Sequence, residues 1–404
     1  MFRIVARLLW LGSVLLTSAC ATQAQDPLGR ALAQQPALRQ VLKKADEYRL
    51  QIVLGTVETD GSGNSYLKQY QYRVSNEYFY PASSVKLFAA VAAAETIERL
   101  GEQTGVELTL DTPLVVHPLF DDDVLEDRDE FNIDGAAITL RQQIRKIFLV
   151  SDNQAYNTLY ELAGQDGIAR SMQAAGLTGS RIVQRLSEFR TPAENRRYPR
   201  IDFMDPQVVY TLAERSSDPL PALQGISRLQ VGQKYFGNGE LHHEPMDFSE
   251  KNYVPLPELQ RGLCKLVQPT LDCGGGPAFA LTEDARDTML EAMSQYPRQS
   301  RNPLYSAAEF PDNYVKEMLP GIARVIPREY IRIYNKTGRA YGFSIENAWV
   351  EDIRTGSGFF LAATLYTNSN GTLNDDQYDY DTIARPFMEA LGEAVAKERW
   401  VRKQ

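Results

Sequence analysis

The sequence YPASSVKLF, residues 80–88, places two serines and a lysine at the start of a predicted helix. The run LFAAVAAAETIERLG predicts this helix over residues 86–100, because its larger apolar side chains recur on one face and Gly101 ends it. Residues three apart share a helix face, so the Ser83 hydroxyl and the Lys86 amine are expected to project together. Serine also caps helices, and a cap is the alternative interpretation. A cap does not account for a lysine in the first turn, where its charge opposes the helix dipole.

A second Ser-x-x-Lys sequence, Ser65 to Lys68, has the same spacing in a different setting. It leads into the alternating segment YLKQYQYRV, which predicts a strand, and residues three apart in a strand point to opposite faces. Only the Ser83 copy therefore predicts a nucleophile and a base on one face.

The first 20 residues predict an export signal. Two arginines precede an apolar run too short to remain as a membrane span, and small residues follow it up to Cys20. This order resembles the signal of bacterial lipoproteins, in which the cysteine becomes the lipidated N-terminus; an ordinary cleaved signal is the alternative. Ala21 in place of aspartate suggests, by the same resemblance, the outer membrane. We therefore expect the protein on the periplasmic side, attached to the membrane through Cys20.

Composition and charge exclude several classes of function. A net charge of −9 with no basic stripe argues against a nucleic-acid partner. There are three histidines, and the sequence has neither HExxH nor GxSxG, so zinc hydrolysis and the α/β-hydrolase triad lack their residues. The acidic loop 120–131 lacks the spacing of a calcium site and is interpreted as solvated surface. We expect no metal and no cofactor, and if the protein is a hydrolase its base is not a histidine.

Two further cysteines, Cys264 and Cys273, lie close together in the sequence. In an oxidising compartment they are expected to form a disulfide that closes a short loop, and two free thiols are the alternative.

Strands are predicted at both ends of the chain and helices between them. The fold class is therefore α/β, with one antiparallel sheet assembled from both ends and an inserted all-α lobe. Residues 216–281 are rich in proline, glycine and aromatics without a clear period, and indicate an insertion or a long ordered loop. The expected organisation is a signal at 1–20, a linker at 21–35, an α/β lobe from 36–79 and 300–404, a helical lobe at 80–215, and an insertion with a connecting helix at 216–299.

Two more short motifs stand in this frame. Ser151-Asp152-Asn153 lies at a break between predicted helices, and Lys336-Thr337-Gly338 ends a predicted strand near the C-terminus. Together with Ser83-x-x-Lys86 they resemble the motif set of the penicillin-recognising family, which includes class A β-lactamases and penicillin-binding proteins. The similarity runs from about residue 36 to the C-terminus, without 216–281. It implies a β-lactamase/D,D-peptidase-like fold and a serine nucleophile.

Chemistry explains why these residue types occur together. A serine hydroxyl attacks a carbonyl only if a base removes its proton, and Lys86 serves as that base if burial and a neighbouring cation such as Lys336 lower its pKa. The resemblance implies the other roles. Ser151 would relay a proton to the leaving nitrogen, and Asn153 would orient both the substrate amide and Lys86. In the Lys-Thr-Gly motif, which Gly338 completes, Lys336 and Thr337 would hold a substrate carboxylate. The backbone N–H groups of Ser83 and Arg339 would form the oxyanion hole.

One departure from the family pattern concerns deacylation. Class A β-lactamases have a Glu-x-x-Leu-Asn segment whose glutamate activates the water that releases the acyl-enzyme. The comparable segment here is RLSEFRTPAENRRYP, and matching Pro192 and Asn195 places Thr191 at the glutamate position. Glu188 and Glu194 are close enough for a shifted loop to present either one. Acylation is thus better supported than deacylation.

Three hypotheses follow for the function. The first is a β-lactamase-like serine hydrolase that opens β-lactam rings. The second is a D-alanyl-D-alanine peptidase or transpeptidase that acts on peptidoglycan peptides. The third is a catalytically idle lipoprotein that binds the cell wall, and the complete motif set argues against it.

Overall fold

The computed structural model describes residues 26–125 and 127–402. Cys20 and the predicted signal lie outside this part. Six strands from both ends of the chain form one sheet, in the order β12-β14-β15-β1-β2, with β13 also paired to β14. The strands are β1 (Gln51–Thr59), β2 (Ser65–Tyr72), β12 (Ile331–Asn335), β13 (Gly338–Ala340), β14 (Phe343–Asp352) and β15 (Ser357–Tyr366). All pairs are antiparallel, and β1 joins β15 in the middle of the sheet.

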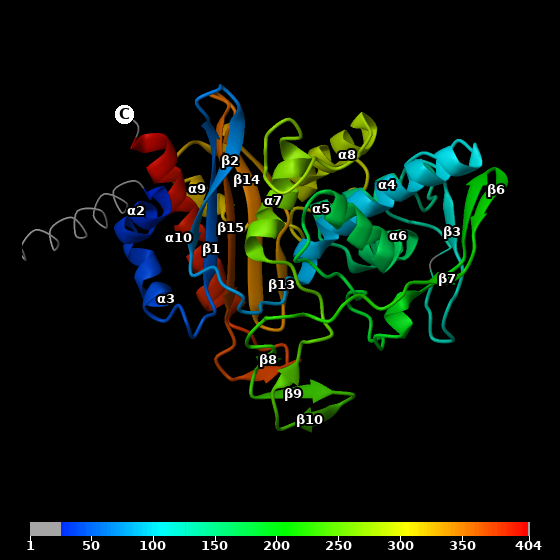
Figure 1. The fold of residues 1–404 in the computed structure, drawn as a ribbon, viewed down its shortest axis with the longest axis horizontal. Helices are drawn as coiled ribbons and strands as arrows, with labels where there is room; N and C mark the ends of the chain where they lie inside the picture. The colour runs from blue at the N-terminus through cyan, green and yellow to red at the C-terminus, as the bar shows by residue number, and fades with distance from the viewer. Residues whose placement is uncertain (1–25, 126, 403–404) are drawn as a thin grey trace, which may run out of the picture.

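Helices cover both faces of this sheet, as Figure 1 shows. Side chains of β15 alternate between two hydrophobic cores: Phe359 and Leu361 point to the side of α10 (Arg385–Ala396), and Phe360 points to the side of α7 (Leu256–Val267). Strands buried on both faces carry continuous apolar runs, which explains the composition of the segment FFLAATL. The predicted fold class, with its sheet from both ends of the chain, is confirmed.

The helical lobe surrounds a central buried helix. This helix, α4 (Lys86–Thr104), is buried along nearly all of its first turns and packs against α6 (Asn153–Ala174). Both neighbouring helices begin at capped ends: Thr139 accepts a hydrogen bond from the N–H of Gln142 at the start of α5 (Leu140–Leu149), and Asp152 does the same at α6. The other helix of this layer is α8 (Glu283–Ser294).

This lobe is not purely helical. It also carries a small antiparallel sheet of β3 (Leu114–Val116), β5 (Ile201–Asp205) and β6 (Gln207–Leu212), and the pair β4 (Arg197–Tyr198) and β7 (Arg215–Ser216). Short helical turns complete the chain: η1 (Pro36–Leu38), α3 (Arg39–Lys43), η3 (Glu194–Arg196), η4 (Pro297–Gln299), α9 (Leu319–Ile322), η5 (Arg328–Tyr330), η6 (Tyr380–Ala384) and η7 (Lys397–Val401).

Part of the segment expected to be a linker is a helix. Residues Pro27–Gln34 form α2, which Asp26 caps, and Leu28 and Leu32 are buried where α2 packs on α10. The segment is only weakly apolar on average, but Leu28, Ala31 and Leu32 fall on one face.

The insertion is ordered and contains its own small strands. These are β8 (Gln230–Val231), β9 (Lys234–Gly237), β10 (Glu240–His242) and β11 (Met246–Asp247), at the bottom of Figure 1. Strand β9 pairs in parallel with β16 (Thr372–Leu373), so the insertion is joined to a loop near the C-terminus. Helix α7 follows; its prolines at positions 255 and 257 suggested a loop, yet they occupy the cap and first turn, where proline is accepted.

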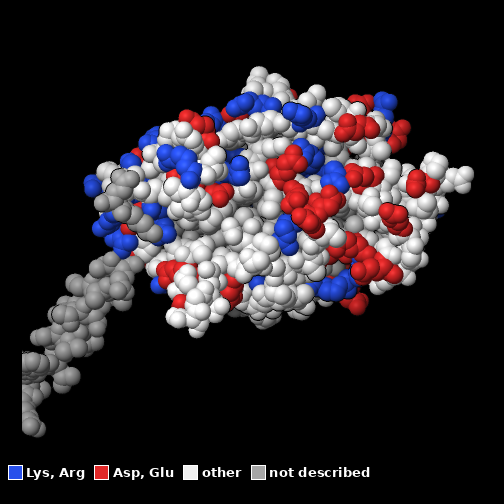
Figure 2. Space-filling model, turned by 90° about the horizontal axis from the view of Figure 1, so that it is seen from above, with Lys and Arg blue, Asp and Glu red and all other residues white. Residues whose placement is uncertain are grey.

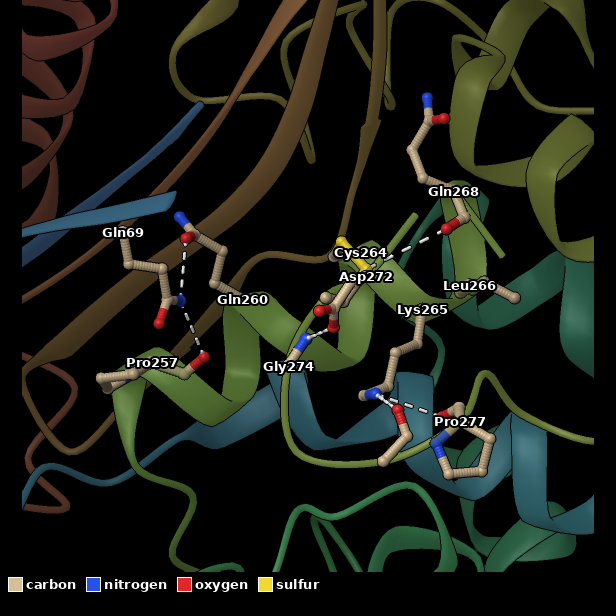
Figure 3. Close-up of a disulfide and its surroundings, with 12 residues drawn as sticks. Gln69, Pro257, Gln260, Cys264, Lys265, Leu266, Gln268, Asp272, Gly274 and Pro277 are labelled. Carbon is tan, nitrogen blue, oxygen red and sulfur yellow. Dashed lines mark hydrogen bonds between the residues drawn. A yellow bond between two sulfur atoms is a disulfide. The ribbon is translucent and has the colours of Figure 1, made fainter. Parts of the chain in front are cut away.

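A disulfide joins α7 to the loop that follows it. Cys264 and Cys273 are bonded, with their Cα atoms 5.9 Å apart (Figure 3). Next to the bond, the carbonyl of Asp272 accepts a hydrogen bond from the N–H of Leu67, at 2.8 Å. The disulfide therefore holds this loop against β2.

Charges of both signs are interspersed on the face seen in Figure 2. Within residues 26–125 and 127–402, none of the helices has the length and apolar content needed to cross a bilayer.

Candidate active site

Ser83 lies on a single helical turn, η2 (Ala82–Val85), directly before α4. Neither serine of this turn caps α4: the start of the helix has no side-chain cap, and the buried Ser84 donates instead to the carbonyl of Pro81, at 2.6 Å. Ser83 is partly buried, and its hydroxyl has no hydrogen-bond partner in the described part of the chain. It lines a cavity of about 770 Å³. Capping therefore does not explain this serine.

Lys86, three residues after Ser83, is fully buried. Its Nζ donates to the carbonyls of Ser151 and Asp152, at 2.5 and 3.0 Å, and to Oδ1 of Asn153, at 2.7 Å. Burial, reinforced by the charge of Lys336, lowers the pKa of Lys86 well below its ordinary value. These acceptors oppose this shift, because they bind the protons of an ammonium group. Lys86 must turn away from at least one of them to accept a proton from Ser83.

Ser151 connects the two lysines of the site. Its hydroxyl accepts hydrogen bonds from Nζ of Lys336, at 2.8 Å, and from Nζ of Lys86, at 3.4 Å. Because both contacts use its lone pairs, its own proton is free for another acceptor. The backbone at Ser151 is left-handed, with φ of 62°, a strained conformation for a side chain other than glycine.

Lys336 is buried at the end of β12 and donates to the carbonyl of Thr337, at 2.9 Å. Burial lowers its pKa to about 7; the charge of Glu346 opposes this shift and that of Lys316 adds to it. Lys336 is thus a cation whose charge changes near neutral pH.

Gly338 is required by close contact with the turn that carries Ser83. A Cβ atom at this position would lie 2.7 Å from the backbone nitrogen of Ser83 and 2.9 Å from the carbonyl oxygen of Pro81. Any larger residue would push β13 away from η2. The glycine therefore fixes the strand against the backbone N–H expected in the oxyanion hole.

Thr337 and Arg339 flank this glycine and both contact buried Glu317. The Thr337 hydroxyl faces the carbonyl of Ile345, at 2.9 Å, and Glu317, at 3.2 Å, so it points into the protein. Its role in holding a substrate carboxylate stays a prediction that requires another rotamer. Nε of Arg339 donates to Glu317, at 2.6 Å, while its buried Nη2 has no hydrogen-bond partner among the described residues.

A buried charged group lies behind the Lys-Thr-Gly motif and carries no motif of its own. Lys316, Glu317 and Glu346 are almost completely buried. Burial and the charge of Glu317 raise the pKa of Glu346 to about 7, and burial lowers that of Lys316 to about 7. The only signal in the sequence is the presence of charged residues inside the apolar segments YVKEML and FSIENAWV.

The cavity is built by segments from distant parts of the chain. Ser83 and Asn153 line it together with Glu188, Arg339 and residues of the insertion and the C-terminal loop. Left-handed residues other than glycine are concentrated on its wall, and such strain is typical of functional sites. They are Ala82, Ser187, Tyr341, Asn374 and Asp376.

The two candidate deacylation bases are placed differently. Glu188 lines the cavity and accepts a hydrogen bond from Asn157, at 2.7 Å. Glu194 is turned toward its own backbone: it accepts hydrogen bonds from the N–H and hydroxyl of Thr191, at 2.8 and 2.7 Å, and these lower its pKa. Of the two, only Glu188 shares the cavity with Ser83.

Asn153 uses both ends of its side chain within the protein. Its oxygen accepts from Lys86, and its nitrogen donates to the Ser187 hydroxyl, at 2.7 Å. It thus fixes Lys86 relative to the segment that carries Glu188; contact with a substrate amide stays a prediction. No group of three or more histidines, cysteines or acidic residues suited to a metal occurs in the described residues.

Part of this chain is similar to a known protein family. Residues 36–215, which contain the first two motifs, match the sequence profile described as the beta-lactamase enzyme family. The resemblance inferred from the three motifs is confirmed.

Solved structures extend the β-lactamase likeness in fold beyond residue 215. A β-lactamase from Xanthomonas campestris has a TM-score of 0.50 and 17% sequence identity, with 92% of this chain and 98% of that chain covered. The structure of L2 complexed with relebactam has the same TM-score and coverage at 15% identity. No match was found among curated proteins. The Lys-Thr-Gly motif lies outside the family match, and the hydrogen bond from Lys336 to Ser151 joins it to the first two motifs.

Proposed function

We propose that the protein is a serine hydrolase that opens β-lactam rings through an acyl-enzyme on Ser83. One observation carries the proposal: a serine hydroxyl without a partner lies on a cavity wall, three residues before a buried lysine of lowered pKa. That lysine donates to a second serine, Ser151, which also accepts a hydrogen bond from a second lysine, Lys336. This arrangement supplies a nucleophile on the cavity wall and, in a hydrogen-bonded group next to it, a base, a proton donor and a cation.

Acylation begins when Ser83 Oγ attacks the β-lactam carbonyl carbon and Lys86, in its neutral form, takes the hydroxyl proton. The ring C–N bond then breaks, and the nitrogen leaves with the proton of Ser151. Ser151 regains a proton from Lys86, whose Nζ lies 3.4 Å away, so no proton is gained or lost overall. The backbone N–H groups of Ser83 and Arg339 bind the developing oxyanion.

Deacylation requires a base that activates water. Glu188 takes this role in the proposal, because it lies on the same cavity wall as Ser83. It removes a proton from water as the oxygen attacks the ester carbon, and that proton returns to Ser83 Oγ when the ester bond breaks. Thr191 stands where the family glutamate is expected, so we expect deacylation to be slower than in an efficient β-lactamase.

Mass spectrometry after incubation with a penicillin tests the proposal. The expected result is a covalent adduct on Ser83 and none in Ser83→Ala. Glu188→Gln should prolong the adduct lifetime by about 10²-fold or more, the range of general-base assistance. Glu194→Gln is the matched control and should not change it. An adduct on Ser84 or Ser65 would overturn the assignment.

A peptidase acting on peptidoglycan would give a different result. Its penicillin adduct would persist in the wild type, and Glu188→Gln would leave the lifetime unchanged. The lifetime of the adduct therefore separates the two activities.

We also propose that the protein is exported and lipid-anchored through Cys20 on the periplasmic side of the outer membrane. The signal-like first 20 residues and the joined Cys264 and Cys273 support this, since disulfides persist in oxidising compartments. Cys20→Ser should release the chain from washed membranes, and persistent attachment would contradict the anchor.

A further inference from the structure

Lys251, from the insertion, lines the cavity that contains Ser83. Its Nζ lies 5.6 Å from the ring centre of Phe248 and 5.4 Å from that of Tyr341. No acidic side chain pairs with it in the described part of the chain. Partial burial lowers its pKa, because the ammonium group loses water without gaining a counter-ion.

Most other charged groups of this wall and of the adjacent insertion have a partner of opposite charge. On the insertion, Glu250 pairs with Arg181 at 3.1 Å. Within the cavity wall, each arginine is paired with a carboxylate: Arg185 with Glu161, Arg190 with Asp122 and Arg339 with Glu317. Asp381 is exposed and pairs with Arg385, and Asp376 is exposed at the edge of the cavity, where water screens its charge. Lys251 is thus the partly buried cation of this wall that has no counter-charge among the described residues.

The direction of β13 places Lys251 relative to the chemistry. Gly338 touches the backbone of Ser83, Lys336 precedes it by two residues and Tyr341 follows it by three. Strand β13 covers only Gly338–Ala340, so Lys336 and Tyr341 lie beyond opposite ends of it. Ser151, the donor to the leaving nitrogen, is bonded to Lys336, so the leaving group lies on that side. The acyl part of a substrate then extends toward Tyr341 and Lys251.

We propose that Lys251 binds a carboxylate on the acyl side of the substrate, distinct from the carboxylate held near Lys336. This inference rests on the proposed function and names its substrate class: acyl donors that carry a second negative charge. A ligand carboxylate would supply the counter-charge that the protein does not. The rings of Phe248 and Tyr341 restrict the amine to this wall, so the recognition is directional.

Penicillins made from 6-aminopenicillanic acid provide matched probes. Succinyl, glutaryl and adipyl side chains end in a carboxylate at increasing distance, and butanoyl, pentanoyl and hexanoyl chains end in a methyl group instead. The measured quantity is the second-order rate of acylation of each penicillin by wild-type enzyme, Lys251→Met and Lys251→Arg. Lys234→Met is the matched control, because it removes the same charge from the same insertion outside the cavity.

In the wild type, at least one carboxylate chain should acylate faster than its methyl counterpart. Lys251→Met should abolish this preference. The acylation rate of that penicillin should fall about tenfold, because a charge-assisted hydrogen bond is lost. The acylation rates of the methyl series should change less than twofold. Lys251→Arg should retain the preference, and Lys234→Met should leave both series unchanged.

Two failures are distinguishable. If no penicillin acylates the wild type, the proposed function is overturned, and the subsite with it. If both series acylate and their ratio is the same in wild type and Lys251→Met, the subsite alone is wrong.

Discussion

Two Ser-x-x-Lys sequences in this chain have opposite properties. Lys68, in strand β2, is exposed; hydrogen bonds with Tyr70 and Glu58 raise its pKa. Lys86, in helix α4, is fully buried, and burial lowers its pKa. The same four-residue spacing thus gives a surface ion pair in one place and a candidate base in the other. What distinguishes them is the secondary structure and burial, which the motif itself does not encode.

The strongest test of this contrast is to remove each lysine. Lys86→Ala should reduce acylation of Ser83 by about 10³-fold, within the usual range for losing a general base. Lys68→Ala, the matched control, should leave the acylation rate within twofold. Circular dichroism would check that both variants fold. Labelling of Lys86→Ala at the wild-type rate would show that another group is the base.

A smaller effect on acylation is expected from a change at the contact between β13 and η2, the turn that carries Ser83. Gly338→Ala would place a methyl group 2.7 Å from the Ser83 nitrogen, so the strand must shift and the oxyanion donors lose alignment. Acylation should fall by about 10²-fold, comparable to the loss of one oxyanion-hole donor. Stopped-flow rates with a chromogenic cephalosporin would measure it. Gly61→Ala, where a Cβ meets nothing within 4 Å, is the control and should acylate normally.

The smallest effect on acylation is expected from the disulfide. Its loop bonds to β2 at Leu67, the strand that carries the Ser65 copy of the motif, and not to the Ser83 turn. Replacing both Cys264 and Cys273 by serine should lower the free energy of unfolding by about 2–3 kcal/mol, the entropic value for a short loop, and leave the acylation rate unchanged. Urea denaturation and penicillin labelling would measure the two quantities. A large loss of acylation would contradict this separation.

The sequence allowed the sheet and the principal motif residues to be predicted, because both depend on local patterns. Alternation and β-branched residues marked the strands, and the structure brings Ser83, Lys86, Ser151 and Lys336 into one site. Motif spacing could be recognised without knowing the contacts between the motifs.

Features that depend on contacts between distant segments were not predicted. Helix α7 was obscured by prolines that are harmless at a helix start. The charges of Lys316, Glu317 and Glu346 become a group only when β12, β14 and the segment before α9 meet. The choice between Glu188 and Glu194 depends on the conformation of one loop, in which Thr191 and Glu194 bind each other.

The contact between Gly338 and Ser83 also bears on the order in which the chain is made. Ser83 and Lys86 are synthesised long before the strand that completes their surroundings. Lys86 needs the nearby charge of Lys336 for part of its lowered pKa, and the Ser83 turn needs β13 beside it. A nascent chain that ends before β12 lacks both, so we expect its Ser83 not to show the reactivity of the finished site. Reactivity would appear only when the last strands dock, and acylation by a penicillin could report the completion of folding.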